Sequence, residues 1–144
     1  MEIKGLNEAS QKIHEANKEK GFYDKPREIG TLLMLIVSEL SEALEADRKN
    51  KHTDWDAFEQ MLGKSISLNK KFIMPVIFRD TNDTENFENK TFEILIKDTF
   101  EDEIADAMIR LFDLCGYMGI DIEKHIDLKL KYNQGRPNKH GKNY

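Results

Sequence analysis

Four carboxylates occur as two matched pairs in this sequence. Glu39 and Glu42 lie three residues apart in one segment of helical character, and Glu103 and Asp106 repeat that spacing in a later segment. Residues three apart lie on the same side of an α-helix, so each pair is expected to project together. Four acids could then meet at one point. A divalent cation such as Mg²⁺ would relieve the cost of removing these carboxylates from water.

The position of Glu39 on the helical wheel is the strongest sequence evidence for such a site. At about 100° per residue it falls among apolar and small residues. These neighbours are Leu32, Leu35, Ile36, Ala43 and Ala46. Glu42 lies between this side and the polar side, while Glu103 and Asp106 belong to a polar stripe of their own helix. A solvated helix face is the simpler explanation for any one such pair, but two pairs and the inward direction of Glu39 favour a metal site.

The composition limits the classes of protein to consider. A chain of 144 residues suits one domain, spanning residues 1–144, and its net charge of −5 argues against broad attraction to nucleic acid. A single cysteine, Cys115, cannot form an internal disulfide, and no signal peptide is visible, so a cytoplasmic location is expected. The longest uncharged apolar run, residues 32–37, is too short to cross a membrane.

Hydrophobic periodicity predicts a mainly helical chain. The expected helices cover about 6–19, 28–49, 55–62, 99–118 and 121–132, with Thr53 or Asp54 capping the third and Asp121 capping the last. The helix at 28–49 has a second apolar side besides the one that contains Glu39. This side is formed by Leu33, Val37, Leu40 and Leu44. Such a helix is expected to be covered on two sides, in a bundle or at a subunit contact.

The region between the acidic pairs differs in character. Residues 72–78 and 91–96 are rich in β-branched and aromatic residues and flank a polar run, which predicts a β-hairpin over about 70–97. We therefore expect a hairpin insertion within the domain, at about 64–97.

The C-terminal segment is basic in an otherwise acidic chain. Lys129 and Asn133 share a helix face, and Arg136 and Lys139 follow in a glycine-containing tail, where a disordered terminus is the alternative. A metal held by four carboxylates, with cations nearby, would suit a phosphate ester or anhydride as substrate.

Several motifs occur in an order that resembles a known family. Ser38-Glu39-Leu40-Ser41-Glu42 and Glu103-Ile104-Ala105-Asp106 look like the E-x-x-E and E-x-x-D motifs of the MazG-like, all-α nucleoside triphosphate pyrophosphohydrolases. Lys129-Leu130-Lys131-Tyr132-Asn133 with Arg136-Pro137, and His14-Glu15-Ala16-Asn17 before Gly21, are similar to further signatures of that family. The departure is the interval from Glu42 to Glu103, which is much longer than the family's usual spacing.

The resemblance implies an antiparallel bundle of about four main helices that forms a homodimer or a dimer of dimers. It implies Mg²⁺-dependent hydrolysis of a nucleoside triphosphate to the monophosphate and pyrophosphate, by water attack at the α-phosphorus. The implied catalytic and metal-binding residues are Glu39, Glu42, Glu103 and Asp106. The implied substrate-binding residues are His14 and Asn17 on the base or sugar side and Lys129, Asn133, Arg136 and Lys139 on the phosphates.

Other interpretations remain open from the sequence. His14 and Asn17 can equally serve a capping or surface role. The substrate can instead be dUTP or phosphoribosyl-ATP. The acidic helices can also belong to a helical interaction module without catalytic activity. No nucleic-acid or membrane partner is expected.

Overall fold

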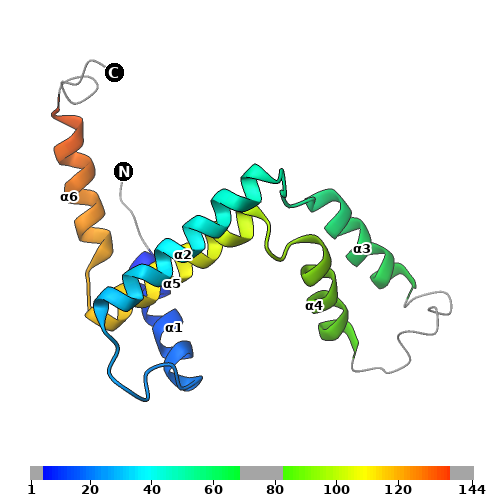
Figure 1. Cartoon of the computed structure of the whole chain (residues 1–144), viewed down its shortest axis with the longest axis horizontal. Coiled ribbons are helices and arrows are strands. Elements are labelled where there is room, and N and C mark those ends of the chain that lie inside the picture. Colours follow the sequence, from blue (N-terminus) through cyan, green and yellow to red (C-terminus); the bar gives the residue numbers. More distant parts are fainter. Residues whose placement is uncertain (1–4, 69–82, 137–144) are drawn as a thin grey trace. The chain divides into compact units, whose positions relative to one another are not determined.

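The computed structural model describes residues 5–68 and 83–136, and every regular element in these ranges is an α-helix (Figure 1). The elements are α1 (Leu6–Glu19), α2 (Ile29–Arg48), α3 (Trp55–Leu68), α4 (Asp83–Leu95), α5 (Phe100–Met118) and α6 (Ile122–Gln134). The all-α class is thus confirmed. The five predicted helices are all present, and only α3 runs clearly longer than its periodicity indicated.

The predicted β-hairpin is wrong where the structure describes it. Residues 91–95, expected in the second strand, are the last turns of α4. The first predicted strand, at residues 72–78, lies outside the described residues.

The physical reason for this correction is the way α4 packs against α3. Thr91 is fully buried and lies one helical turn from half-buried Phe87 and Leu95, while Phe92 and Ile94 are exposed. The spacing of four residues between these positions is the period of a helix, whereas a strand would have placed alternate residues on opposite faces. The Thr91 hydroxyl donates to the Phe87 carbonyl at 2.8 Å, which satisfies it inside the helix. Packing therefore overrode the β-propensity of the segment.

Side-chain caps begin three of the helices. Asp54 accepts a hydrogen bond from the Ala57 N–H at 2.9 Å, and Asp121 accepts from the Lys124 N–H at 3.1 Å, so Asp54 and Asp121 are confirmed as N-caps. Thr99 serves α5 in the same way, at 3.3 Å from the Asp102 N–H. At the other end of α5, Gly119 has a φ of +63°, a left-handed conformation that ends helices and favours glycine.

The described chain forms two compact units, which we call the terminal unit (Met1–Ile36 and Met108–Tyr144) and the central unit (Val37–Ala107). Helices α2 and α5 contribute residues to both.

The terminal unit contains a close approach between α1 and α5. A Cβ atom at Gly116 would lie 2.5 Å from the Ser10 carbonyl oxygen and 2.7 Å from the His14 Cβ, so no larger residue fits there. Buried Leu114 and Cys115 lie beside this contact in the sequence. The lone cysteine is therefore part of the core, as its apolar neighbours indicate.

Helices α1 and α6 of the terminal unit cap each other. The Asn7 side-chain oxygen accepts from the Ile122 N–H at 3.0 Å at the start of α6, and its amide nitrogen donates to Asp121 at 2.8 Å. In return, a Glu123 carboxylate oxygen accepts from the Asn7 N–H at 3.1 Å at the start of α1. Backbone N–H groups that a helix start leaves without partners are thereby satisfied across the two helices.

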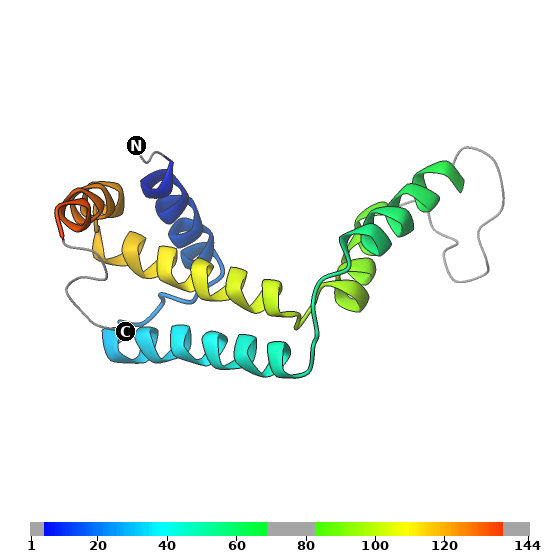
Figure 2. The ribbon, with the colours of Figure 1, turned by 90° about the horizontal axis from the view of Figure 1, so that it is seen from above.

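In the central unit, Figures 1 and 2 show the end of α2 running alongside the start of α5. The two segments run in opposite chain directions. The buried apolar residues of these segments are small, namely Ala43 and Ala46 on α2 and Ala107 on α5. Small side chains let two helix backbones approach closely. This close approach brings the acidic residues of the two helices together.

Candidate metal centre

Three of the four predicted carboxylates meet within the central unit. One carboxylate oxygen each from Glu39, Glu103 and Asp106 lies within 4.8 Å of the other two. Glu39 and Glu103 are only 7% and 5% exposed, while Asp106 is exposed. The inward direction predicted for Glu39 is therefore confirmed. Glu103, which the wheel placed on a polar stripe, is also buried.

The fourth predicted acid, Glu42, lies at the edge of this group. It is exposed and lies outside the set of three oxygens, and it accepts a hydrogen bond from the Ser38 hydroxyl at 3.3 Å. It is still close enough for its charge to act on Glu103. The structure thus brings all four acids into one neighbourhood, with Glu42 on the solvent side.

The negative charges of the cluster affect the pKa of Glu103. The pKa of its carboxyl is raised to about 7, first by burial and then by the negative charges of Glu42, Glu39, Asp102 and Asp106. Without a counter-charge, the cluster therefore tends to hold a proton at Glu103 near neutral pH. A bound cation would reverse this tendency, because it stabilises the ionised carboxylates.

The donor set suits a hard divalent cation. All three side chains offer carboxylate oxygens, the ligands that Mg²⁺ and Ca²⁺ prefer. Two oxygen ligands on opposite sides of a Mg²⁺ ion lie about 4.2 Å apart, and two oxygens on opposite sides of a Ca²⁺ ion are slightly farther apart. The oxygen separations of up to 4.8 Å are therefore close to what a shared ion requires. The cluster could hold a metal ion, and three protein ligands would leave coordination positions for other oxygens.

A network of hydrogen bonds joins the loop after α2 to the start of α5. One Glu101 oxygen accepts from the Thr53 N–H at 2.9 Å, and the other lies 3.0 Å from the His52 Nδ1. The hydroxyls of Thr53 and Thr99 lie 2.8 Å apart, and the Phe100 N–H donates to the Lys51 carbonyl at 2.9 Å. We call this network the Glu101 latch.

The Glu101 latch ties the end of α2 to the start of α5, two residues before Glu103. The sequence does not reveal this network because its members lie far apart in the chain. The local signal is three acids in the first turn of α5, which are common there for dipole reasons alone.

His14, a predicted substrate-binding residue, belongs to a polar cluster within the terminal unit. Its Nδ1 lies 2.9 Å from one oxygen of Asp113, and the Tyr23 hydroxyl donates to the other oxygen at 2.8 Å. The rings of His14 and Tyr23 meet edge to face at 4.5 Å, and Tyr117 lies against both. Burial, and then the Asp113 carboxylate, raise the pKa of the Tyr23 phenol above its ordinary value.

These contacts give His14 a structural role that the sequence did not indicate, because its partner Asp113 is buried and distant in the chain. They leave its predicted role toward a substrate untested. Asn17 is half-buried near the end of α1, where its backbone carbonyl accepts from the Phe22 N–H at 3.1 Å.

The basic residues predicted for phosphate binding lie on and just after α6. Lys129 and Arg136 are exposed and Asn133 is half-buried, whereas Lys139 lies outside the described residues. At about 100° per residue, Asn133 falls on the same side as Lys129, as predicted, and near Arg136. The described part of this cluster therefore shares one face of the helix.

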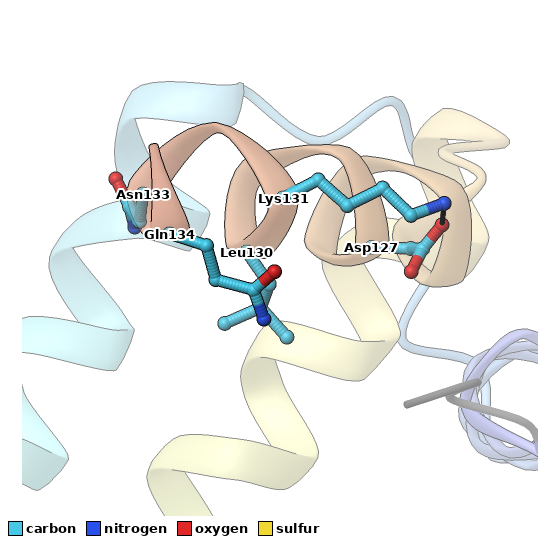
Figure 3. A pocket seen from close by; sticks show the side chains of 5 residues that line it. All are labelled: Asp127, Leu130, Lys131, Asn133 and Gln134. Atoms are coloured by element: carbon cyan, nitrogen blue, oxygen red, sulfur yellow. Dashed lines mark hydrogen bonds and ion pairs between the residues drawn. The ribbon is translucent and has the colours of Figure 1, made fainter. Parts of the chain in front are cut away.

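A wide cavity of about 490 Å³ lies along α6 and meets this face at Asn133 (Figure 3). It is lined by Asp127, Leu130, Lys131, Asn133 and Gln134. In Figure 3 the Lys131 ammonium reaches back to Asp127, 2.6 Å away. Lys131 is the one cation among the described residues that line the cavity, and this ion pair neutralises it, so that lining does not favour an anion. The predicted cations Lys129 and Arg136 are absent from its lining.

No protein-family model, curated protein or solved structure matches the chain. Within residues 5–68 and 83–136, none of the helices is long and apolar enough to span a membrane.

Proposed function

We propose that the protein is a MazG-like, all-α nucleoside triphosphate pyrophosphohydrolase that uses Mg²⁺. The observation that carries this proposal is the convergence of Glu39, Glu103 and Asp106, with Glu42 at the edge, from two helices that are distant in the sequence. Each pair alone is a common pattern. Their meeting in space is what a shared metal site requires, and the motif resemblance supplies the reaction.

In this proposal, Glu39, Glu103 and Asp106 hold the metal. A bound Mg²⁺ would neutralise phosphate oxygens and lower the pKa of a water molecule in its coordination shell. Glu42 is left to accept a proton from the attacking water, because it lies outside the set of three oxygens and is exposed. The water oxygen forms a bond to the α-phosphorus while the bond from that phosphorus to the α,β-bridging oxygen breaks. The products are the nucleoside monophosphate and pyrophosphate.

The substrate roles in the terminal unit rest on the resemblance and on residue type. Lys129, Asn133, Arg136 and Lys139 are proposed to bind the phosphates, since cations and amides are suitable donors to phosphate oxygens. His14 and Asn17 are proposed for the base or sugar. The base, the sugar and a preference for dUTP or phosphoribosyl-ATP are to be decided by a panel of substrates.

We further propose that the protein acts as a homodimer or a dimer of dimers within a bundle of about four main helices. The supporting observation is an apolar stripe on α2, in which Val37, Leu40 and Leu44 are each nearly half exposed. A helix that is apolar on two sides is expected to be covered on both. Light scattering coupled to gel filtration gives the mass, and a monomer at micromolar concentration would contradict this part of the proposal.

The reaction is tested with the purified full chain, Mg²⁺ and a panel of canonical and damaged nucleoside triphosphates, scoring pyrophosphate release. Hydrolysis in ¹⁸O-labelled water should place the label in the monophosphate, and label in pyrophosphate would overturn attack at the α-phosphorus. Titration calorimetry of Mg²⁺ with a non-hydrolysable triphosphate separates an enzyme from an interaction module. A module should show no metal-dependent nucleotide binding.

Glu39→Gln supplies the matching variant. Its side chain is nearly isosteric but cannot offer a charged ligand, so turnover should fall by at least about a hundredfold while the helical circular dichroism is unchanged. Glu93→Gln is the control, because it removes one charge from an exposed position of the same unit. Wild-type activity in Glu39→Gln would show that the metal assignment is wrong.

A further inference from the structure

The exposed ring of Tyr132 lies close to two cationic side chains of the terminal unit. The Lys129 Nζ is 5.3 Å from the ring centroid, and the Arg136 guanidinium carbon is 5.8 Å from it. Both distances fall within the range of cation–π attraction, which extends to about 6 Å. Tyr132 is 62% exposed, so core packing does not account for this large aromatic side chain.

The backbone brings these three residues to one side of α6. Lys129 precedes Tyr132 by three residues and Arg136 follows it by four, the two spacings at which helical neighbours meet. Although α6 ends at Gln134, Gly135 keeps a right-handed helical conformation, and the Arg136 N–H donates to the Asn133 carbonyl at 3.1 Å. The added turn therefore carries Arg136 back toward the ring.

The charges of this face differ from those of the cavity in Figure 3. Lys131 pairs with Asp127 at 2.6 Å, whereas no ion pair within the described ranges involves Lys129 or Arg136. Two neighbouring cations repel each other. The electron-rich face of the ring offsets part of that repulsion, and an anion with several negative oxygens would offset more of it.

We infer that Tyr132 is a positioning residue that holds Lys129 and Arg136 together for the polyphosphate group of the substrate. This inference rests on the proposed function, which assigns the two cations to the phosphates. The ring acts through them and does not take part in the chemistry. Its hydroxyl is not required, because the attraction belongs to the aromatic face.

The test compares Tyr132→Leu with Tyr132→Phe in the full chain. Loss of the ring should raise the KM for the best triphosphate, and the Kd for inorganic tripolyphosphate in Mg²⁺ buffer, by about two- to fivefold, and kcat should change by less than about twofold. Tyr132→Phe should restore both constants. Leu128→Ala is the control, since it truncates another exposed apolar side chain of the same helix.

Nuclear magnetic resonance tests the contact itself, whereas the split between KM and kcat and the rescue by Tyr132→Phe test its role in binding. The ring current of Tyr132 should displace the resonances of the side-chain methylenes of Lys129 and Arg136, and Tyr132→Leu should abolish this displacement while Tyr132→Phe keeps it. The inference is overturned if Tyr132→Leu binds tripolyphosphate as tightly as the wild type, or if Tyr132→Phe is as impaired as Tyr132→Leu.

The two proposals fail separately. A wild type that binds tripolyphosphate but releases no pyrophosphate from any triphosphate would overturn the proposed reaction and leave the role of Tyr132 to be decided by the binding data. A wild type that hydrolyses triphosphates with no difference among the Tyr132 variants would overturn the inference alone. A wild type that does not bind tripolyphosphate would also overturn it.

Discussion

Replacing Glu103 by glutamine should stabilise the metal-free protein at neutral and alkaline pH. Glu103 is 5% exposed and its pKa is raised to about 7, chiefly by burial and then by neighbouring carboxylates. Its ionised form is therefore disfavoured in the folded state. Glutamine has nearly the same shape and carries no charge, so it removes that cost.

The magnitude follows from the displacement of the pKa. A group whose pKa is raised in the folded state contributes stability below its unfolded value, here 4.5, and loses it as the pH rises through about 7. The full displacement corresponds to about 3 kcal/mol. Solvent reaches the exposed carboxylates of Glu42 and Asp106 and screens part of the repulsion, so we expect a gain of about 2 kcal/mol for Glu103→Gln at pH 8.

The assay is thermal and urea unfolding in EDTA from pH 4.5 to 8. The wild type should lose stability across this range, and Glu103→Gln should lose less, with a Tm about 5 °C higher at pH 8. Adding Mg²⁺ should stabilise the wild type much more than the variant, because the variant lacks one charged ligand. Glu93→Gln serves as the matched control. The reasoning is refuted if Glu103→Gln is no more stable than the wild type at pH 8, or if wild-type stability is flat between pH 4.5 and 8.

Three further predictions concern the contacts that hold the helices. Gly116→Ala should lower the free energy of unfolding in urea by about 2 kcal/mol or more, because its Cβ would meet the backbone of α1. The control Gly63→Ala, with open space around it, should be neutral or stabilising, and equal urea midpoints for the two variants would contradict the close approach. Asp113→Asn should cost about 1–3 kcal/mol, since one of the two oxygens that face His14 and Tyr23 becomes an amide nitrogen, which cannot accept a hydrogen bond. An unchanged urea midpoint would show that this cluster is not needed. The pKa of Glu101 is lowered to about 2, mainly by the hydrogen bond from the Thr53 N–H, so its contribution to folding stability is present above pH 4.5 and is lost as the pH falls toward 2. Glu101→Gln should reduce this acid-induced loss of stability by about 1 kcal/mol or less, and an acid unfolding curve identical to that of the wild type would contradict this prediction.

Local sequence patterns were enough to predict most of the helices and the direction of one acid. Apolar periodicity located α1, α2 and α5, and Asp54 and Asp121 marked helix starts, because capping and amphipathicity depend on residues within a few positions. The same local periodicity showed that Glu39 lies on the apolar side of α2. The segment at 91–95 was predicted as a strand for a related reason, since its β-branched residues favour a strand when packing against α3 is left out.

Which of these local features meet depends on how the helices pack. The convergence of Glu39 with Glu103, the pairing of His14 with Asp113, and the Glu101 latch all join residues that are distant in the chain. No local rule encodes such distances, because they depend on how closely two helices approach. Small buried residues such as Ala43 and Ala107 permit a close approach. The sequence supplied the carboxylates, and the packing of α2 on α5 made them a single candidate site.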